Sequence, residues 1–578
     1  MKNYLILIFG ALMLLLSACS SEKGGGGGGK DDGRSEVTIQ NSTVALTYEV
    51  GKSGTVTFSS TGDWTIANNN PQDLSISPTS GKAGNQTLTV KSLATNKTNA
   101  VRSLTFSIKP NGGTAKTVTV NQDPVFVVKN LHYDIKPEGE TVTVSWSANL
   151  NDDVYIRYGG DFDSMWETLA NSSRAAGTDG SADVKMTRAT NTFDFTFKIL
   201  PNKTKSVKEG FFMFVHHSNE EYQSDVIVFT QMPEGGAEES TDYSRDGEVS
   251  TLLKHSGVEQ GIPVVLMGDA YIDKQIESGQ YKRDIQQACD YLFSIEPMKS
   301  MKNCFDVYSV VAVSKNNVVS PQTSTAFKTE FDKEGSTYVF GDVKICENYA
   351  KKALKDEKQM ENALLVVIVN DGRQSGTTMP VVTNQPQNGV PMGYSIAFIP
   401  VYNDSFEVMM HHEAVGHGLG KLADEYGSES SIYAANGSIL DHPDELDELK
   451  FCQENFAMLN VSLESDPLKT PWAKLYEDKR FAAEKLNAYE GAYTFPKDAY
   501  RPTYESMMRS NNSGFNAISR QLIYKRVMSI AHNHNWTFDY EDFVKFDEPA
   551  RKATKAVVSV PSGLQKRHVS PIWKIEHK

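Results

Sequence analysis

Hydrophobic and polar residues alternate in short runs along residues 37–233, which is the pattern of β-strands that bury one face. Glycine, asparagine and serine separate these runs and mark turns between the predicted strands. Two short sequences occur twice, namely T-V-T-F/V-S at 55–59 and 141–145, and Q-x-P at 122–124 and 231–233. The repetition predicts two all-β immunoglobulin-like sandwiches, one over 37–125 and the other over 126–233.

The pattern changes beyond a polar linker, which we place at 234–260. From there, runs of β-branched residues predict buried strands, and apolar residues spaced three and four apart predict helices. The predicted strands are 262–269, 305–313, 363–369 and 393–400, and the predicted helices are 281–295 and 343–354. Strands that alternate with helices are typical of layered α/β folds. We therefore expect an α/β (α+β) domain over 261–545 and a C-terminal extension over 546–578.

The first 19 residues have the form of an export signal. Their apolar run, Tyr4–Leu16, is shorter than the roughly 20 residues that a membrane-spanning helix needs. The signal ends in L-S-A-C, which resembles a bacterial lipobox in which Cys19 becomes lipidated after cleavage; the alternative is an ordinary secretory signal with a chance cysteine. Six consecutive glycines then predict a flexible tether over 20–36. We expect an outer-membrane lipoprotein, exposed at the cell surface, that meets the membrane only through its lipid anchor.

The net charge and the cysteine spacing exclude two kinds of site, one for nucleic acid and one for a metal bound by C-x-x-C. The formal net charge is −14 and no long basic run occurs, so we exclude binding to nucleic acid. Besides Cys19 the chain has Cys289, Cys304, Cys346 and Cys452, and none of them has the C-x-x-C spacing of a metal site. An exported protein can oxidise its thiols, but the spacing of these cysteines does not specify a pairing.

The sequence H-H-E-A-V-G-H-G-L-G-K-L-A-D-E-Y, at 411–426, contains a zinc-peptidase motif that is one residue too long. In H-E-x-x-H the histidines lie four residues apart on one helix face, whereas His412 and His417 lie five apart. Each residue of an α-helix turns by about 100°, so these two side chains would point about 140° apart. A π-bulge at Gly416 absorbs one residue and removes the conflict. Dipeptidyl peptidase III, a zinc enzyme, has the similar spacing H-E-x-x-G-H, so we expect both histidines to bind one ion.

A third ligand is expected shortly after the second histidine. The glycine three residues after His417 is similar to that of metzincin peptidases, whose third ligand lies six residues after the second histidine. That position holds Ala423, whose side chain cannot bind a metal. The nearest candidate ligand is therefore Asp424, and the next is Glu425.

A second sequence, R-P-T-Y-E-S-M-M-R-S at 501–510, resembles the Met-turn of metzincins. In that turn a methionine packs beneath the zinc ion, which here would be Met507 or Met508; the alternative is ordinary core packing of both. Together with M-G-D-A-Y at 267–271 and the histidine motif, this turn resembles the IgA peptidases, metzincin-like zinc metallopeptidases of gut bacteria. The resemblance covers roughly residues 260–545 and implies hydrolysis of peptide bonds with one Zn2+ per chain.

The resemblance and the chemistry of the residues together predict the roles within the site. We expect His412, His417 and Asp424 to hold Zn2+ and to leave one position open for water. Glu413, next to the first ligand, is suited to take a proton from that water as the general base. Candidates of the same region for holding the oxyanion are Tyr426, Tyr504 and Arg509.

A second resemblance concerns the first β-domain, and the peptidase resemblance also suggests a substrate. Segment 37–125 resembles the BACON domain, an immunoglobulin-like module associated with carbohydrate or mucin binding; the alternative is a spacer. We expect the substrate to be an extended segment of an extracellular protein, such as host immunoglobulin A or a mucin glycoprotein, whose backbone pairs with an edge strand at 393–400. Two other functions stay open, namely a non-catalytic surface adhesin that binds carbohydrate and a zinc amidase that acts on cell-wall peptides.

Overall fold

The computed structural model describes residues 35–97, 99–149, 154–167, 181–184, 192–216, 219, 222–332, 336–401, 405–427, 437–511, 513–552 and 569–577. Cys19 and the predicted tether lie outside these residues. The chain divides into two compact units, of which the first comprises the residues up to Asn96 together with Val101–Asp123. The second comprises Lys97–Ala100 and the chain from Pro124 onward. Among the residues described, no helix is both long and apolar enough to cross a membrane.

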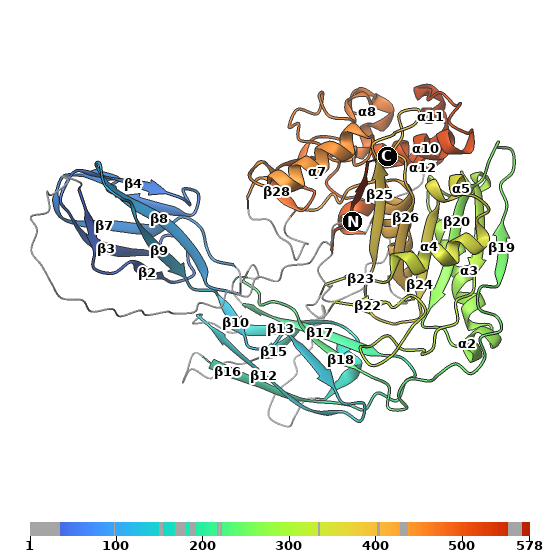
Figure 1. Cartoon of the computed structure of the whole chain (residues 1–578), viewed down its shortest axis with the longest axis horizontal. Helices are drawn as coiled ribbons and strands as arrows, with labels where there is room; N and C mark the ends of the chain where they lie inside the picture. Colours follow the sequence, from blue (N-terminus) through green and yellow to red (C-terminus); the bar gives the residue numbers. More distant parts are fainter. Residues whose placement is uncertain are drawn as a thin grey trace, which may run out of the picture. The chain divides into compact units, whose positions relative to one another are not determined.

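The first unit is an all-β domain of two packed sheets (Figure 1). One sheet has the order β1 (Val37–Ile39), β3 (Ser53–Ser60), β7 (Gly84–Ser92), β5 (Leu74–Ser77), and the other has the order β2 (Thr43–Leu46), β9 (Lys116–Gln122), β8 (Arg102–Pro110), β4 (Trp64–Asn68), β6 (Ser80–Gly81). Alternate residues of both sheets point into one shared core. Trp64 belongs to that core and packs edge-on against Phe58, with ring centroids 5.0 Å apart.

The second unit begins with another all-β domain of two sheets. Their orders are β10 (Phe126–Val128), β12 (Glu140–Ala148), β16 (Thr192–Ile199), β14 (Trp166–Glu167), and β11 (His132–Ile135), β18 (Ile227–Gln231), β17 (Lys208–His216), β13 (Val154–Gly160), β15 (Ser181–Val184). Aromatic side chains fill its core. Phe162, in helix α1 (Phe162–Met165), lies 5.1 Å from Trp166 and 5.2 Å from Phe212 between ring centroids.

The sequence repeat corresponds to a shared structural position in the two all-β domains. In each domain the last strand pairs in parallel with the second strand and ends in a buried glutamine, with Gln122 opposite Leu46 and Gln231 opposite Ile135. Both glutamine side chains donate hydrogen bonds to backbone carbonyl groups of neighbouring loops. A buried amide needs such partners, which explains why the Q-x-P sequence closes both domains.

The rest of the second unit contains, within its described part, a seven-stranded mixed sheet. Its order is β19 (Val249–Leu253), β21 (Phe305–Val310), β20 (Ile262–Asp269), β24 (Leu364–Val369), β26 (Ser395–Pro400), β25 (Thr377–Thr383), β29 (Lys574–Glu576). The strands β21, β20, β24 and β26 run parallel, and β25 runs antiparallel to β26. The four predicted strands are thus confirmed, as are the two predicted helices, α3 (Gln280–Leu292) and α4 (Val343–Ala353).

Helices cover both faces of this sheet (Figure 1). Along β20, Val264 and Leu266 point to the face that carries α3, α10 (Ala517–Ala531) and the histidine helix. The intervening residues, Val265 and Met267, point to the opposite face, where α4 packs. Strands that are buried on both faces are apolar at nearly every position, and such continuous apolar runs in the sequence predict them.

One expectation about the sheet is wrong. Strand β26, which corresponds to the predicted edge strand at 393–400, has β24 on one side and β25 on the other. The prediction missed β25, because its sequence T-T-M-P-V-V-T contains Pro380 and threonines instead of an apolar run. The sheet also includes β19, from the predicted linker, and β29, from the predicted C-terminal extension.

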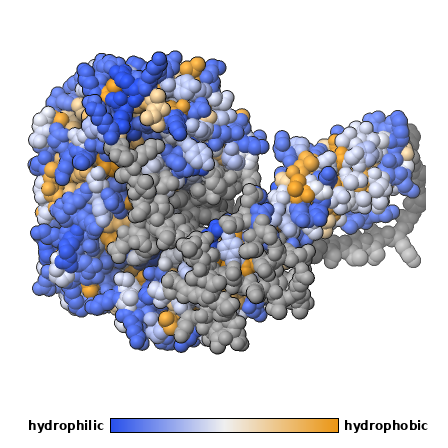
Figure 2. Space-filling model, turned by 180° about the vertical axis from the view of Figure 1, so that it is seen from behind, coloured by the Kyte–Doolittle hydropathy of each residue, from blue (hydrophilic) through white to orange (hydrophobic). Residues whose placement is uncertain are grey.

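Shorter elements complete this domain. They are α2 (Asp273–Glu277), β22 (Glu330–Phe331), β23 (Val339–Phe340), α5 (Glu357–Glu361), α6 (Phe406–Met409), α7 (Pro443–Glu454), α8 (Ala473–Glu477), β27 (Tyr489–Ala492), β28 (Phe495–Arg501), α9 (Met507–Ser510), α11 (Tyr540–Phe546) and α12 (Glu548–Lys552). Three short 3-10 helices lie among the described residues at Lys302–Cys304, Ile439–Asp441 and Lys479–Glu484. Where described residues face the viewer in Figure 2, hydrophilic side chains predominate and apolar ones are scattered among them, as expected for a face in contact with water.

The four cysteines of the described chain, Cys289, Cys304, Cys346 and Cys452, are buried and unpaired. Burial raises the pKa of Cys289 and Cys304 to about 11 and that of Cys452 to about 12. A thiol with such a high pKa carries little thiolate at neutral pH. These cysteines therefore serve as small apolar core residues.

Candidate metal centre

The histidine motif forms a π-helix over Met410–Leu419, which continues α6. The amide of Gly420 donates to the carbonyl of Val415 at 2.7 Å, the five-residue spacing of a π-helix. The expected five-residue hydrogen bonding is therefore present, and it forms a π-helix from Met410 to Leu419 instead of a single bulge at Gly416. As a result the rings of His412 and His417 lie on one side of the helix, with 3.0 Å between their Nε2 atoms.

Close packing explains the glycine in the middle of this helix. A Cβ atom at Gly416 would overlap Sδ of Met508, which lies against the helix backbone at that point. The thioether thus approaches the turn between the two histidines more closely than any other residue at 416 would allow.

We predict that Gly416→Ala lowers the unfolding free energy of this domain by about 1–3 kcal/mol, because Met508 or the helix must shift to admit the methyl group. Scanning calorimetry of the full chain measures the effect. Gly235→Ala is the matched control, since a Cβ there has nothing within 4 Å, and its effect should stay within about 0.5 kcal/mol. Equal effects of the two substitutions would contradict this packing argument.

The chain reverses immediately after the π-helix and returns to the histidines. Lys421 adopts a left-handed backbone conformation, with φ of 51°, and its buried ammonium group donates to the carbonyl of Tyr394 at 2.8 Å. Three residues later, Oδ1 of Asp424 lies 3.2 Å from Nε2 of His412 and 3.3 Å from Nε2 of His417. The structure thus brings His412, His417 and Asp424 together around one point.

Backbone carbonyl groups fix the tautomers of both histidines. Nδ1 of His412 lies 2.9 Å from the carbonyl oxygen of Met507, and Nδ1 of His417 lies 2.7 Å from that of Leu422. A carbonyl oxygen only accepts hydrogen bonds, so each Nδ1 carries the ring proton and each neutral ring has its lone pair on Nε2. Both lone pairs then face Asp424 Oδ1, which has no hydrogen-bond donor in the described part of the chain.

Three atoms that carry lone pairs converge at this point, and a cation between them, either a proton or a metal ion, offsets their mutual repulsion. Two ligands of a tetrahedral ion with bonds of about 2.0–2.1 Å lie about 3.4 Å apart, and the three observed separations are 3.0, 3.2 and 3.3 Å. Two imidazole nitrogens and one carboxylate oxygen suit a divalent transition metal. The residues present therefore fit a metal ion at this point.

The electrostatics of the centre favour positive charge. Burial alone would lower the pKa of His412, but the Asp424 carboxylate more than offsets it and raises that pKa to about 9. Burial would likewise raise the pKa of Asp424, but the two histidines hold it well below its usual value. The second carboxylate oxygen of Asp424 accepts a hydrogen bond of 2.9 Å from the hydroxyl of Tyr426, which keeps Oδ1 directed at the histidines.

Glu413 lies beside this centre on the π-helix. Its carboxylate accepts a hydrogen bond of 2.7 Å from the hydroxyl of Thr378, on strand β25. Its charge also acts on the rings nearby, since it contributes to the raised pKa of His412. Thr378 was not singled out in the sequence, because nothing in T-T-M-P-V-V-T distinguishes the threonine that reaches the site.

The structure places Glu425, the alternative third ligand, away from the histidines. Its buried carboxylate accepts hydrogen bonds from Ser506 at 2.6 Å, from Asn516 at 2.8 and 3.0 Å and from Asn460 at 3.0 Å. In this loop only the Asp424 carboxylate faces the two histidines. Glu425 instead ties the loop of Asp424 to the segment around Met508, whose carbonyl accepts from the Glu425 amide at 2.7 Å.

The remaining predicted residues occupy three different environments. Met507 and Met508 are fully buried in helix α9 beside the π-helix, the first holding His412 through its carbonyl and the second packing on Gly416. Tyr426 is buried and bound to Asp424. Tyr504 is exposed, and Arg509 stacks over its ring at 5.1 Å while donating to Glu505 at 2.7 Å.

Residues 251–482 match the family model described as IgA Peptidase M64. This part of the chain belongs to the IgA peptidase family. Members of the family are metallopeptidases, and the matched range includes the whole motif at 411–426 and M-G-D-A-Y at 267–271. No curated protein matches the chain. The BACON-like assignment of residues 37–125 and the lipid anchor at Cys19 stay predictions.

Solved structures resemble parts of the chain at low identity. One is a GH5 xyloglucanase of Bacteroides ovatus in complex with a XXXG heptasaccharide, at 17% identity over 25% of this chain and 29% of that chain, with a TM-score of 0.14. Another is CBD12 from CALX1.2, at 8% identity over 32% of this chain and 82% of that chain, with a TM-score of 0.16. The match thus spans less than a third of the xyloglucanase, and TM-scores of this size support no argument about fold or function.

Within the IgA peptidase domain, the aspartate of M-G-D-A-Y organises a loop. Asp269 is buried at the carboxyl end of β20 and accepts hydrogen bonds from Ser314 at 3.0 Å, Thr325 at 2.8 Å and Thr329 at 2.5 Å. A buried carboxylate needs several such partners. It therefore fixes the course of the loop over 314–329.

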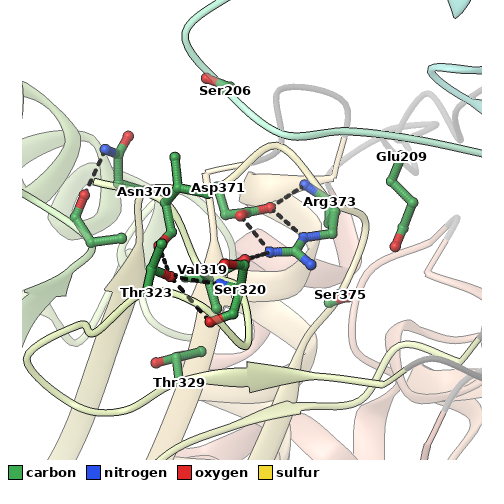
Figure 3. Close-up of polar contacts among 12 residues, drawn as sticks. Ser206, Glu209, Val319, Ser320, Thr323, Thr329, Asn370, Asp371, Arg373 and Ser375 are labelled. Atoms are coloured by element: carbon green, nitrogen blue, oxygen red, sulfur yellow. Dashed lines mark hydrogen bonds and ion pairs between the residues drawn. The ribbon is translucent and has the colours of Figure 1, made fainter. Parts of the chain in front are cut away.

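That loop borders a cavity of about 720 Å³. His132 and Asp134 of the second all-β domain line one side, and the segment 319–332 lines the other. At its edge the buried guanidinium of Arg373 donates to Asp371 and to the carbonyl of Val319 at 2.9 Å, as Figure 3 shows. Among these groups, His132 pairs with Asp134 at 3.1 Å and Arg373 pairs with Asp371 at 2.8 Å.

Proposed function

We propose that the IgA peptidase domain is a zinc-dependent endopeptidase in which one Zn2+ is held by His412, His417 and Asp424. The observation that carries the proposal is the convergence of two Nε2 lone pairs and one carboxylate oxygen within 3.3 Å of one another. Nitrogen and oxygen ligands in a set of three are typical of catalytic zinc, which keeps a fourth position open. When bound, the ion would lower the pKa of a water molecule and polarise the scissile carbonyl group.

Glu413 is the proposed general base. Its carboxylate lies next to the first ligand in sequence and beside the ligand set in space, so it can accept the proton of a water molecule and pass it to the leaving amine. Thr378 holds the carboxylate through the 2.7 Å hydrogen bond and so fixes its direction. Tyr426 acts indirectly, by positioning Asp424.

Strand β25 is the proposed partner of the substrate backbone. It follows β26 in the sheet order and carries Thr378. Only the side chain of Thr378 therefore separates the backbone of β25 from the carboxylate of Glu413. Pairing with a strand requires an extended peptide and reads side chains weakly. This suits a linker or hinge of an extracellular protein. The family supplies immunoglobulin A as the first candidate to test, and mucin glycoproteins are the second.

The cellular setting is part of the proposal. A lipidated Cys19 and the glycine-rich tether over 20–36 would anchor the protein to the outer membrane. The two all-β domains would then hold the peptidase away from the surface, or bind carbohydrate near the substrate. Protease treatment of intact cells tests this location, because a chain protected until the outer membrane is broken would lie in the periplasm.

Cleavage of defined substrates tests the activity. The purified full chain, loaded with zinc, should cut intact immunoglobulin A or mucin into discrete fragments, and chelation should stop the reaction. An unfolded control protein shows whether extended chains in general are cut. Hydrolysis of muramyl peptides alone would indicate the amidase, and no hydrolysis of any substrate by the zinc-loaded chain would indicate the adhesin.

A further inference from the structure

The last described residues of the chain return to the metal centre. We call residues 569–577 the strap. Its strand β29 pairs in parallel with the far half of β25, with Val381 opposite Lys574 and Thr383 opposite Glu576. Strand β25 is therefore flanked on both sides, by β26 and by the strap.

The strap continues along β25 toward the general base. The amide of Ile572 donates to the carbonyl oxygen of Thr378 at 2.9 Å. Thr378 is the residue whose hydroxyl binds Glu413. The strap thus occupies the backbone position of β25 that is nearest to the proposed base.

The start of the strap lies near Glu413. The amide of Gly376, which lies close to the side chain of Glu413, donates to the carbonyl of Thr337 at 2.9 Å. The amide of Val569 donates to the hydroxyl of Thr337 at 3.0 Å. Thr378, which holds the proposed base, and Thr337, which is linked to it through Gly376, are therefore both in contact with the strap.

The centre is closed in this state. His412, Glu413 and Asp424 are each 2% exposed and His417 is 1% exposed. An endopeptidase that cuts a folded extracellular protein must admit a segment of polypeptide to these groups. Since an extended peptide would pair with β25, the strap and the substrate compete for the same backbone groups.

The attachment of the strap is light. Its strand pairs through three residues, whereas β24 and β26 pair through six. Ile572 is 37% exposed, and Trp573 is only partly buried against the cluster that contains Ala423.

From these contacts we infer that the strap is an autoinhibitory segment that fills the substrate-binding edge of β25 and leaves when an extended peptide takes its place. The inference rests on the proposed endopeptidase function. It adds that the enzyme's own residues 569–577 cover the substrate-binding edge of β25, and that the substrate must displace them. The fraction of molecules with the strap released then limits the apparent affinity for substrate.

Removal of the strap tests the inference. The chain that ends at His568 should hydrolyse a quenched fluorescent peptide with kcat/KM raised at least about tenfold, mainly through KM. Because truncation could disturb folding, Ile572→Pro provides a second test, since it removes the amide that binds Thr378 and leaves the rest of the strap. Ile572→Ala is its matched control, because it keeps the amide and should behave as the unmodified chain. Unchanged or lower kcat/KM in a folded truncated chain, or equal kcat/KM in the two Ile572 variants, would overturn the inference.

A binding measurement separates this inference from the proposed function. A fluorescent peptide with the sequence of residues 569–578 should bind the truncated Glu413→Gln protein, measured by fluorescence anisotropy without any turnover. An unlabelled extended peptide should displace it. If no form of the chain hydrolyses peptides but the strap peptide binds and is displaced, the proposed function fails and the strap remains a competitor at β25. If the strap peptide does not bind, the inference fails whatever the activity.

Discussion

Replacing Glu413 by glutamine is expected to lower kcat/KM for peptide hydrolysis by about 10²- to 10⁴-fold, the contribution typical of general acid–base catalysis. The amide has nearly the same shape as the carboxylate, and its oxygen can still accept the hydrogen bond from Thr378. It cannot take a proton from water. The loss should therefore appear in turnover, while the bound zinc, measured by elemental analysis, stays at one per chain.

Glu407→Gln is the matched control for this substitution. Glu407 lies in the first turn of α6, which the π-helix continues, and accepts a hydrogen bond of 2.9 Å from Ser294. The same chemical change at this position should leave kcat/KM unaltered. Turnover of the Glu413 variant at the level of the unmodified chain would remove Glu413 from the mechanism.

Loss of a ligand is the second large effect that we expect. His417→Ala removes one of three ligands and should abolish stoichiometric zinc binding, as should Asp424→Ala. Tyr426→Phe removes only the hydroxyl that positions Asp424, so zinc affinity should fall by about 10- to 100-fold. Titration against a chelator of known affinity measures the zinc affinity of each variant and so ranks the variants. Retention of one zinc by the His417 variant would refute the ligand assignment, and loss of zinc in Glu425→Ala but not in Asp424→Ala would make Glu425 the third ligand.

The same titration has a predicted pH dependence. In the metal-free protein the pKa of His412 is raised to about 9, so at neutral pH a proton occupies the position of the metal. Zinc must displace that proton, and the apparent affinity should therefore increase with pH until about pH 9. An affinity that is independent of pH between 6 and 9 would show that the metal does not contact His412.

Much of the α/β domain could be predicted because its central strands are buried on both faces. Strands β20 and β24 are apolar at every position, and a continuous apolar run of that length is easily recognised. Strand β25 is equally buried, but Pro380 and three threonines hide it. Strand β29 has three residues and a pairing partner about two hundred positions earlier, so no local pattern identifies it.

The residues of the candidate site could be predicted from the sequence. The backbone conformations and distant residues that position them could be predicted only in part. The spacing of His412 and His417 required an altered helix, and the structure contains one. The distance of Asp424 depends on a left-handed turn at Lys421, which is a rare conformation for lysine and gave no signal. Asn460 and Asn516, which hold the ligand loop through Glu425, are distant in the chain and could be found only after folding.

The orientation of both histidines by main-chain oxygens has a genetic consequence. The acceptors of the Nδ1 protons are the carbonyl groups of Met507 and Leu422, and every amino acid carries such a carbonyl. No codon change at these two positions can delete the acceptor itself, whereas an aspartate or glutamate in this role would be lost by one nucleotide substitution. Random mutation should therefore inactivate this centre mainly through the ligands and Glu413, and substitutions at 422 and 507 should be tolerated as far as side-chain volume permits.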